Sequence, residues 1–183
     1  MNNERHILQL FARGDSRAMD VLYAEFADYM AGVCVRYVTQ PDDIRDVLQE
    51  ALIKVFSSVG TFKYRGEGSL KAWLTRVVVN EALMFLREKK KMLFVDSERD
   101  IPDAPDEPPD TSGLTADMVD EALRQLPDGY RAVFNLYAIE GKSHKEIAEL
   151  LGIKPDTSAS QFHKAKNLLA KMINDYKKQK ELQ

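Results

Sequence analysis

Hydrogen-bonding and cationic side chains at helical spacing near the end of the chain could bind DNA. Ser143 and Glu146 have the spacing of a capping box, and Gly152 stands where the short helix they begin would end. Pro155 restarts the chain, and a second amphipathic helix follows. Two helices joined by so short a turn predict a helix-turn-helix, whose second helix enters the DNA major groove.

The second helix, which we expect Asp156 or Thr157 to cap, presents its polar residues on one side. Hydroxyl, amide, imidazole and ammonium groups of this kind suit base edges and phosphates. That exposed side is expected to carry Thr157, Ser160, His163, Lys164, Asn167 and Lys171. The alternative interpretation, an ordinary pair of helices with a solvated polar face, stays open at this point.

A glycine-rich stretch between residues 60 and 69 interleaves Phe62 and Tyr64 with Lys63 and Arg65. Aromatic rings beside cations suit unstacked nucleobases and their phosphates. The simpler alternative is a surface loop that tucks one aromatic ring onto the core. We expect Ser69 to cap the helix that follows, which runs to about residue 91 and whose Trp73 is a core residue.

An earlier helix is predicted to begin at Pro41, because a proline followed by two acids favours a helix N-terminus. Apolar residues at helical spacing predict one buried face, made of Ile44, Val47, Leu48, Ala51, Leu52, Val55 and Phe56. The opposite face carries Asp43, Arg45, Asp46, Gln49, Glu50 and Lys54. Such a polar face is ordinarily solvated, although it could also be a docking surface.

Composition excludes several classes of protein. No apolar run approaches the roughly 20 residues of a membrane span, and the polar N-terminus lacks a signal-peptide core, so we expect a cytoplasmic protein without membrane insertion. Cys34 is the one cysteine, which rules out an internal disulfide and a cysteine-based zinc site. His6, His144 and His163 are scattered, and no paired carboxylates or nucleophile with its base occur. We therefore expect no metal, no cofactor and no enzyme activity.

The acidic residues are concentrated in one segment. Residues 1–95 and residues 118–183 each carry two more basic than acidic side chains, whereas residues 96–117 carry eight acids and one arginine. Four prolines and few apolar residues make residues 95–114 a flexible linker. The sequence thus predicts an all-α protein of two small helical domains, 1–94 and 115–183, joined by an acidic, Pro-rich linker, with the helix-turn-helix in the second domain.

Several segments, in the same order and spacing, resemble the extracytoplasmic-function (ECF) group of the sigma-70 family, and the resemblance covers nearly the whole chain. Asp-Val-Leu-Gln-Glu at 46–50 is similar to the family's helix that binds the clamp coiled coil of the RNA polymerase β′ subunit. Residues 66–74, followed by Arg76 and Asn80, resemble its promoter-melting segment. The C-terminal domain, which in the family binds the β flap and the minus-thirty-five element, is matched by Leu126-Pro127, Tyr130-Arg131, Val133-Phe134, Glu140-Gly141, Glu146-Ile147-Ala148 and Leu151-Gly152.

The resemblance implies three sets of contacts. Core polymerase, through its β′ subunit, would contact Asp46, Gln49 and Glu50. A flipped nontemplate base of the minus-ten element would be held by Phe62, Lys63, Tyr64 and Arg65, with Arg76 and Asn80 on nearby DNA. The minus-thirty-five element would be contacted by Thr157, Ser160, Gln161 and Lys164.

The start of the recognition helix departs from the family's commonest pattern. Many relatives have Val and Lys after the threonine, where this chain has Ser158 and Ala159. The function implied is that of an ECF sigma factor, which binds core polymerase, recognises both promoter elements and promotes DNA melting and transcription initiation. The family also implies an anti-sigma partner, and a monomer when the protein is free.

Two other functions stay open from the residues themselves. A conventional helix-turn-helix transcriptional regulator would read a palindromic site as a stable dimer, whereas a sigma factor would read an asymmetric promoter. A protein–protein adaptor would not bind DNA at all.

Overall fold

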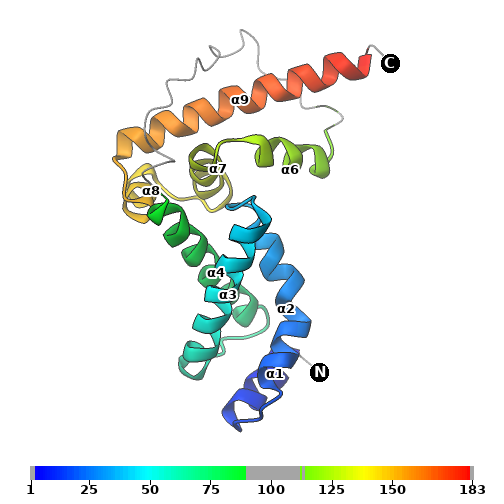
Figure 1. Cartoon of the computed structure of the whole chain (residues 1–183), viewed down its shortest axis with the longest axis vertical. Coiled ribbons are helices and arrows are strands. Elements are labelled where there is room, and N and C mark those ends of the chain that lie inside the picture. The colour runs from blue at the N-terminus through cyan, green and yellow to red at the C-terminus, as the bar shows by residue number, and fades with distance from the viewer. Residues whose placement is uncertain (1–2, 90–111, 113, 182–183) are drawn as a thin grey trace. The chain divides into compact units, whose positions relative to one another are not determined.

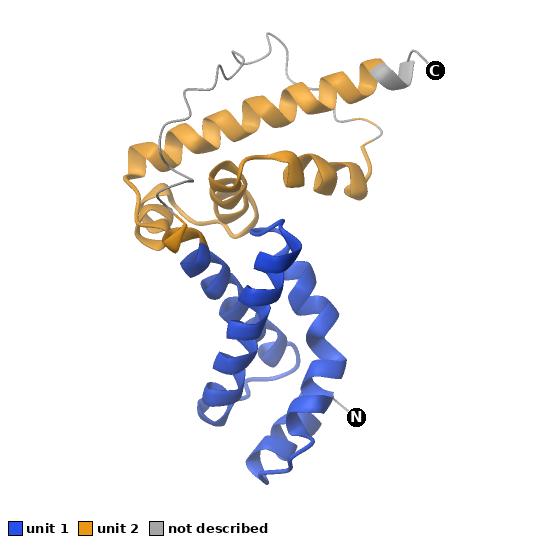
Figure 2. Cartoon of the chain, in the orientation of Figure 1, with its two compact units in different colours: residues 1–85 blue, residues 86–183 orange. Residues whose placement is uncertain are grey.

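The computed structural model describes residues 3–89, 112 and 114–181, and the side chains of these up to residue 178. The chain divides into two compact units, residues 1–85 and 86–183 (Figure 2). Every regular element among the described residues is helical, which confirms the predicted all-α class. The predicted linker lies, apart from Ser112 and Leu114, outside the described residues, so the domain boundaries at 94 and 115 stay predictions.

The first unit is built from α1 (Asn3–Ala12), α2 (Ala18–Cys34), α3 (Pro41–Ser58), the 3-10 turn η1 (Val59–Thr61) and α4 (Ser69–Glu88), whose last residues pass the unit boundary (Figure 1). Helix α2 packs against both α1 and α3. Polar contacts connect α4 to α2 and α3. Tyr29 Oη on α2 lies 2.7 Å from Thr75 Oγ1, and Lys54 Nζ on α3 lies 2.5 Å from Glu81 Oε1. Fully buried apolar side chains form the core, among them Ile7, Leu22, Met30, Ala51, Val55, Leu70, Leu74 and Val78.

Helix α3 begins at Pro41, as predicted, with the proline in its first turn. Its buried stripe is narrower than the sequence predicted. Val47, Ala51 and Val55 are buried, whereas Phe56 is 66% exposed. The prediction for Phe56 was wrong because the neighbouring helix α2 covers only part of the apolar face of α3 and leaves a groove along its side.

The start of α4 differs from the prediction in its cap. Ser69 is the first residue of the helix, and its hydroxyl pairs with the preceding loop, at Arg65 and Gly66. The acceptor at the N-terminus of α4 is instead the carboxylate of Glu4, on α1. Local spacing could not reveal this cap, because it comes from a residue more than sixty positions away.

The second unit contains α6 (Ala116–Gln125), α7 (Asp128–Phe134), the π-helical segment η2 (Asn135–Ile139), α8 (His144–Leu151) and α9 (Pro155–Glu181). The long helix α9 packs against α6, α7 and α8 (Figure 1). Ala165, on the apolar stripe of α9, is buried in one cluster with Leu126 and Tyr130. After Phe134 the helix α7 widens into the π-helical turn of η2.

Candidate functional site

The turn between α8 and α9 has the predicted local chemistry. Ser143 Oγ accepts a hydrogen bond from the Glu146 backbone N–H at 3.3 Å, and Glu146 Oε2 accepts one from the Ser143 N–H at 2.8 Å. The Ser143 N–H and the Ser143 hydroxyl both donate to this carboxylate, which favours its charged form and holds the pKa of Glu146 below its usual value. Gly152 ends α8 with φ 63° and ψ 38°, in the left-handed region that favours glycine. The predicted helix-turn-helix is therefore confirmed.

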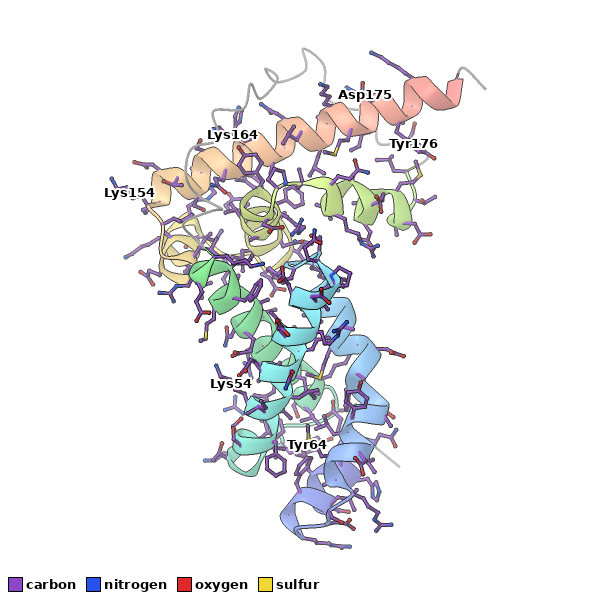
Figure 3. The ribbon with its side chains drawn as sticks, viewed as in Figure 1. Lys54, Tyr64, Lys154, Lys164, Asp175 and Tyr176 are labelled. Atoms are coloured by element: carbon purple, nitrogen blue, oxygen red, sulfur yellow. The ribbon has the colours of Figure 1, made fainter. Side chains whose placement is uncertain are left out.

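Helix α9, the second helix of this motif, begins at Pro155, ahead of the caps expected at Asp156 or Thr157. That expectation was wrong because a proline without an N–H suits the first helical position, and the Ser158 N–H donates to the Lys154 carbonyl at 3.0 Å. Figure 3 shows Lys154 at the start of α9 and Lys164 further along the same helix.

The exposed side of α9 carries most of the polar groups predicted there. Ser160, His163 and Lys171 are exposed, and Thr157 and Lys164 are half-buried. Asn167 and Gln161 are buried, at 9% and 8% exposure, because their positions turn toward the rest of the second unit. Asn167 was wrongly expected on the exposed side. The buried amide of Gln161, whose Oε1 has no hydrogen-bond partner among the described residues, cannot reach a base edge in this conformation.

An aromatic cluster that sequence reasoning missed supports the inner side of the same motif. The Tyr137 ring, on η2, stacks on the His144 ring with centroids 4.5 Å apart and meets the Phe162 ring at 4.4 Å. Nothing in the local sequence pattern connects Phe162 to His144, the first residue of α8. The cluster joins η2, α8 and α9.

In the first unit, the side chains of the loop between α3 and α4 alternate between half-buried and exposed. Phe62 and Tyr64 are half-buried, whereas Lys63 and Arg65 are exposed. The Phe62 ring lies against Trp73, with centroids 5.3 Å apart, so one aromatic is tucked onto α4, as the simpler alternative proposed. Lys63 and Arg65, the sequence neighbours of Tyr64, are nevertheless exposed, as binding of a nucleic-acid backbone requires.

Two further candidates continue this surface along α4. Arg76 and Asn80 are both exposed, and residues four apart lie on the same side of a helix. The helix and the loop that precedes it therefore combine aromatic, cationic and amide groups near its beginning and middle.

The polar face of α3 is solvent-accessible. Asp46, Gln49 and Glu50 are all exposed. Gln49 also lines an apolar groove of about 580 Å³ between α2 and α3, in which Tyr23, Ile53 and Phe56 are exposed. Exposed aromatic and aliphatic side chains rimmed by polar ones are typical of protein-binding surfaces.

Across the part of the chain that the structure describes, no cluster of three or more His, Cys, Asp or Glu residues could hold a metal ion. In the same residues, none of the helices combines the length and the apolar character that a membrane-spanning segment needs.

The helix-turn-helix, with its exposed polar side, makes this an all-helical protein of the DNA-binding class. Two family models match separate parts of the chain. The model described as "Sigma-70 region 2" matches residues 22–92, and the model described as "Sigma-70, region 4" matches residues 116–169.

Known proteins match across both units. The ECF RNA polymerase sigma-E factor of Haemophilus influenzae is 28% identical and is matched over 93% of this chain and 95% of its own length. RNA polymerase sigma factor SigV of Bacillus subtilis is 32% identical over 73% of this chain and 77% of its own length. The chain belongs to the sigma-70 family and is an ECF RNA polymerase sigma factor.

Among solved structures, the sigma factor RpoE of Bartonella quintana, crystallised with the anti-sigma factor NepR, is similar to this chain. It is 20% identical with a TM-score of 0.47, over 86% of this chain and 98% of that one.

Proposed function

We propose that this ECF sigma factor is a dissociable promoter-specificity subunit with three separate working surfaces. Core RNA polymerase carries out catalysis, so the chain itself is not an enzyme and needs no cofactor. It acts in the cytoplasm as a monomer that binds promoter DNA tightly only when mounted on core polymerase. The observation that carries the proposal is the presence, on one sigma-70 chain, of a helix-turn-helix and an aromatic–cationic loop.

The first surface is the exposed polar face of α3. We propose that Asp46, Gln49 and Glu50 bind the β′ subunit of core polymerase, with the second unit contacting the β subunit. Exposure of all three side chains supports this proposal, since none of them is committed to the core of the first unit. The adjoining apolar groove would add buried area to such an interface.

The second surface is the loop before α4. Phe62, Lys63, Tyr64 and Arg65 would hold an unstacked nontemplate base of the minus-ten element, while Arg76 and Asn80 contact neighbouring DNA. Unstacking a base costs a few kcal/mol, and stacking with hydrogen bonding in a pocket offsets a similar amount. The outward cations beside a half-buried tyrosine support this role.

The third surface is the start of α9. Thr157, Ser160 and Lys164 are the proposed contacts to the minus-thirty-five element, because their side chains are accessible at the first turns of the recognition helix. Gln161, the fourth residue predicted there, packs inside the unit in the free chain. Its contact with DNA would require the side chain to turn outward.

Transcription with purified core polymerase on a genomic promoter library tests the whole proposal. The chain should direct initiation at asymmetric promoters with two elements, and the free chain should bind the same duplexes poorly. A stable dimer that binds a palindrome tightly without core polymerase would contradict it and favour a conventional regulator.

Replacing Asp46 and Gln49 together with alanine tests the polymerase-binding surface. Core affinity should fall while the helical content of the chain is unchanged. The matched control replaces Asp20 and Gln9, an exposed acid and an exposed amide elsewhere in the first unit, and should bind core normally. Equal affinity for both double variants would refute the surface assignment.

A partner that holds the factor inactive is also proposed. The family resemblance suggests an anti-sigma protein, and the α3 surface would serve both it and polymerase. Competition between core polymerase and a candidate partner for the labelled chain would test this.

A further inference from the structure

The N-terminus of α4 is capped by a residue from another helix. The backbone N–H groups of Leu70 and Lys71 donate to the Glu4 carboxylate, at 3.4 and 3.0 Å. Glu4 is only 6% exposed. A carboxylate at a helix N-terminus satisfies donors that lack intrahelical partners and faces the positive end of the helix dipole. Helix α1 thus supplies from a distance the cap that α4 lacks in its own sequence.

This cap leaves Ser69 available to shape the loop. The Ser69 hydroxyl donates to the Gly66 carbonyl at 2.6 Å and accepts the Arg65 N–H at 3.2 Å. The turn therefore closes on the first residue of α4. Glu4 binds the same first turn of α4, so both the loop and α1 are attached to that turn.

The neighbouring residue on α1 contacts the loop directly. The guanidinium carbon of Arg5 lies 5.2 Å from the centre of the Tyr64 ring, a cation–π distance. Arg5 is exposed and Tyr64 is half-buried, so the arginine covers part of the tyrosine near the surface. Two consecutive residues of α1 thus fix the two ends of the segment from Tyr64 to Leu70.

We propose that α1 is the positioning element of the base-capture loop, with Glu4 setting the turn and Arg5 orienting the Tyr64 ring. The inference rests on the proposed function of that loop. A preformed loop binds an unstacked base with less ordering cost than a mobile one. Loosening α1 should therefore weaken promoter melting, while the α3 face and the helix-turn-helix keep their own contacts.

The test uses full-length chains carrying Glu4→Ala, Glu4→Gln or Arg5→Ala, each assembled with core polymerase on one promoter. Duplex and artificially premelted forms of that promoter are compared. Glu4→Ala should yield roughly tenfold fewer open complexes on duplex DNA, the effect expected from losing hydrogen bonds to a charged group. Glu4→Gln should lie between it and the wild type, because one carbonyl acceptor remains. Premelted DNA should largely restore transcription, and core affinity should not change.

The controls are Asp20→Asn and Arg13→Ala, which remove one exposed charge each from the same unit. Both should behave as the wild type on either template. If Glu4→Ala does not fold, Arg5→Ala provides the same test, because Arg5 is exposed. Its loss of open complexes should also be confined to duplex DNA.

Three outcomes would overturn the inference. These are an equal loss of transcription on duplex and premelted DNA, a loss of affinity for core polymerase, or no loss of open complexes on duplex DNA. The first two would mean that α1 contributes only to folding. A wild-type chain that never binds core polymerase would instead refute the proposed function, and the inference with it.

Discussion

The imidazole Nδ1 of His144 lies 3.0 Å from the hydroxyl of Ser158, so the first residue of α8 is hydrogen-bonded to the first turn of α9. Ser158 is completely buried. The rings of Tyr137 and Phe162 surround the same histidine. One polar contact inside an aromatic cluster therefore fixes how the recognition helix leaves the turn.

Replacing Ser158 with alanine should weaken the packing of α8 against the start of α9, because it removes the His144–Ser158 hydrogen bond. The substitution leaves a partly buried imidazole nitrogen without its partner, which costs about 1 kcal/mol. Hydrogen exchange at the α8 amides should accelerate accordingly. Ser160→Ala, an exposed substitution two residues away, is the control and should leave protection unchanged. Identical protection in both variants would show that the hydrogen bond adds no stability.

The Lys54–Glu81 ion pair should contribute to the stability of the first unit, because the Glu81 carboxylate is buried. Glu81 is 7% exposed and Lys54 is its 2.5 Å partner. Lys54→Met should destabilise the first unit by about 2 kcal/mol, because it leaves a buried carboxylate uncompensated. Adding Glu81→Leu should recover most of that loss.

Urea unfolding followed by tryptophan fluorescence measures this pair. Trp73 is the one tryptophan of the chain, so its emission reports on the first unit alone. A double variant as unstable as Lys54→Met would contradict the explanation.

Cys34 should be chemically inert in the folded chain. Burial raises the pKa of its thiol to about 11, from an ordinary value of 9.0. A thiol reagent at pH 8 should label it only in denaturant. Because the folded-state pKa is the higher one, the contribution to stability is complete below pH 9 and is lost as the pH rises toward 11. A Cys34→Ala variant should lack this alkaline loss, and rapid labelling of the native chain would contradict the prediction.

Lys164 should act as a phosphate contact of the recognition helix. Lys164→Ala should weaken holoenzyme binding to all promoters alike and reduce the slope of log affinity against log salt by about one. Lys178→Ala removes an exposed charge near the end of the same helix and should leave the slope unchanged. The same slope for both variants would remove Lys164 from the proposed contacts.

Local features of the fold could be predicted from residues a few positions apart. The capping box at Ser143, the helix end at Gly152 and the helix start at Pro41 all depend on neighbours within one turn. The exposure of residues could be predicted less well. Phe56 and Asn167 lie on faces whose covering depends on other helices, and periodicity alone does not say how wide that covering is.

The sequence by itself therefore determined the helices, the helix-turn-helix and the sigma-70 family of this chain. Only the tertiary structure decided what holds the functional segments in place. Glu4 caps α4 from 66 residues away, and His144 meets Ser158 across the turn between two helices. The physical reason is that caps and helical stripes arise from neighbours along the chain, whereas hydrogen bonds between helices depend on how those helices pack.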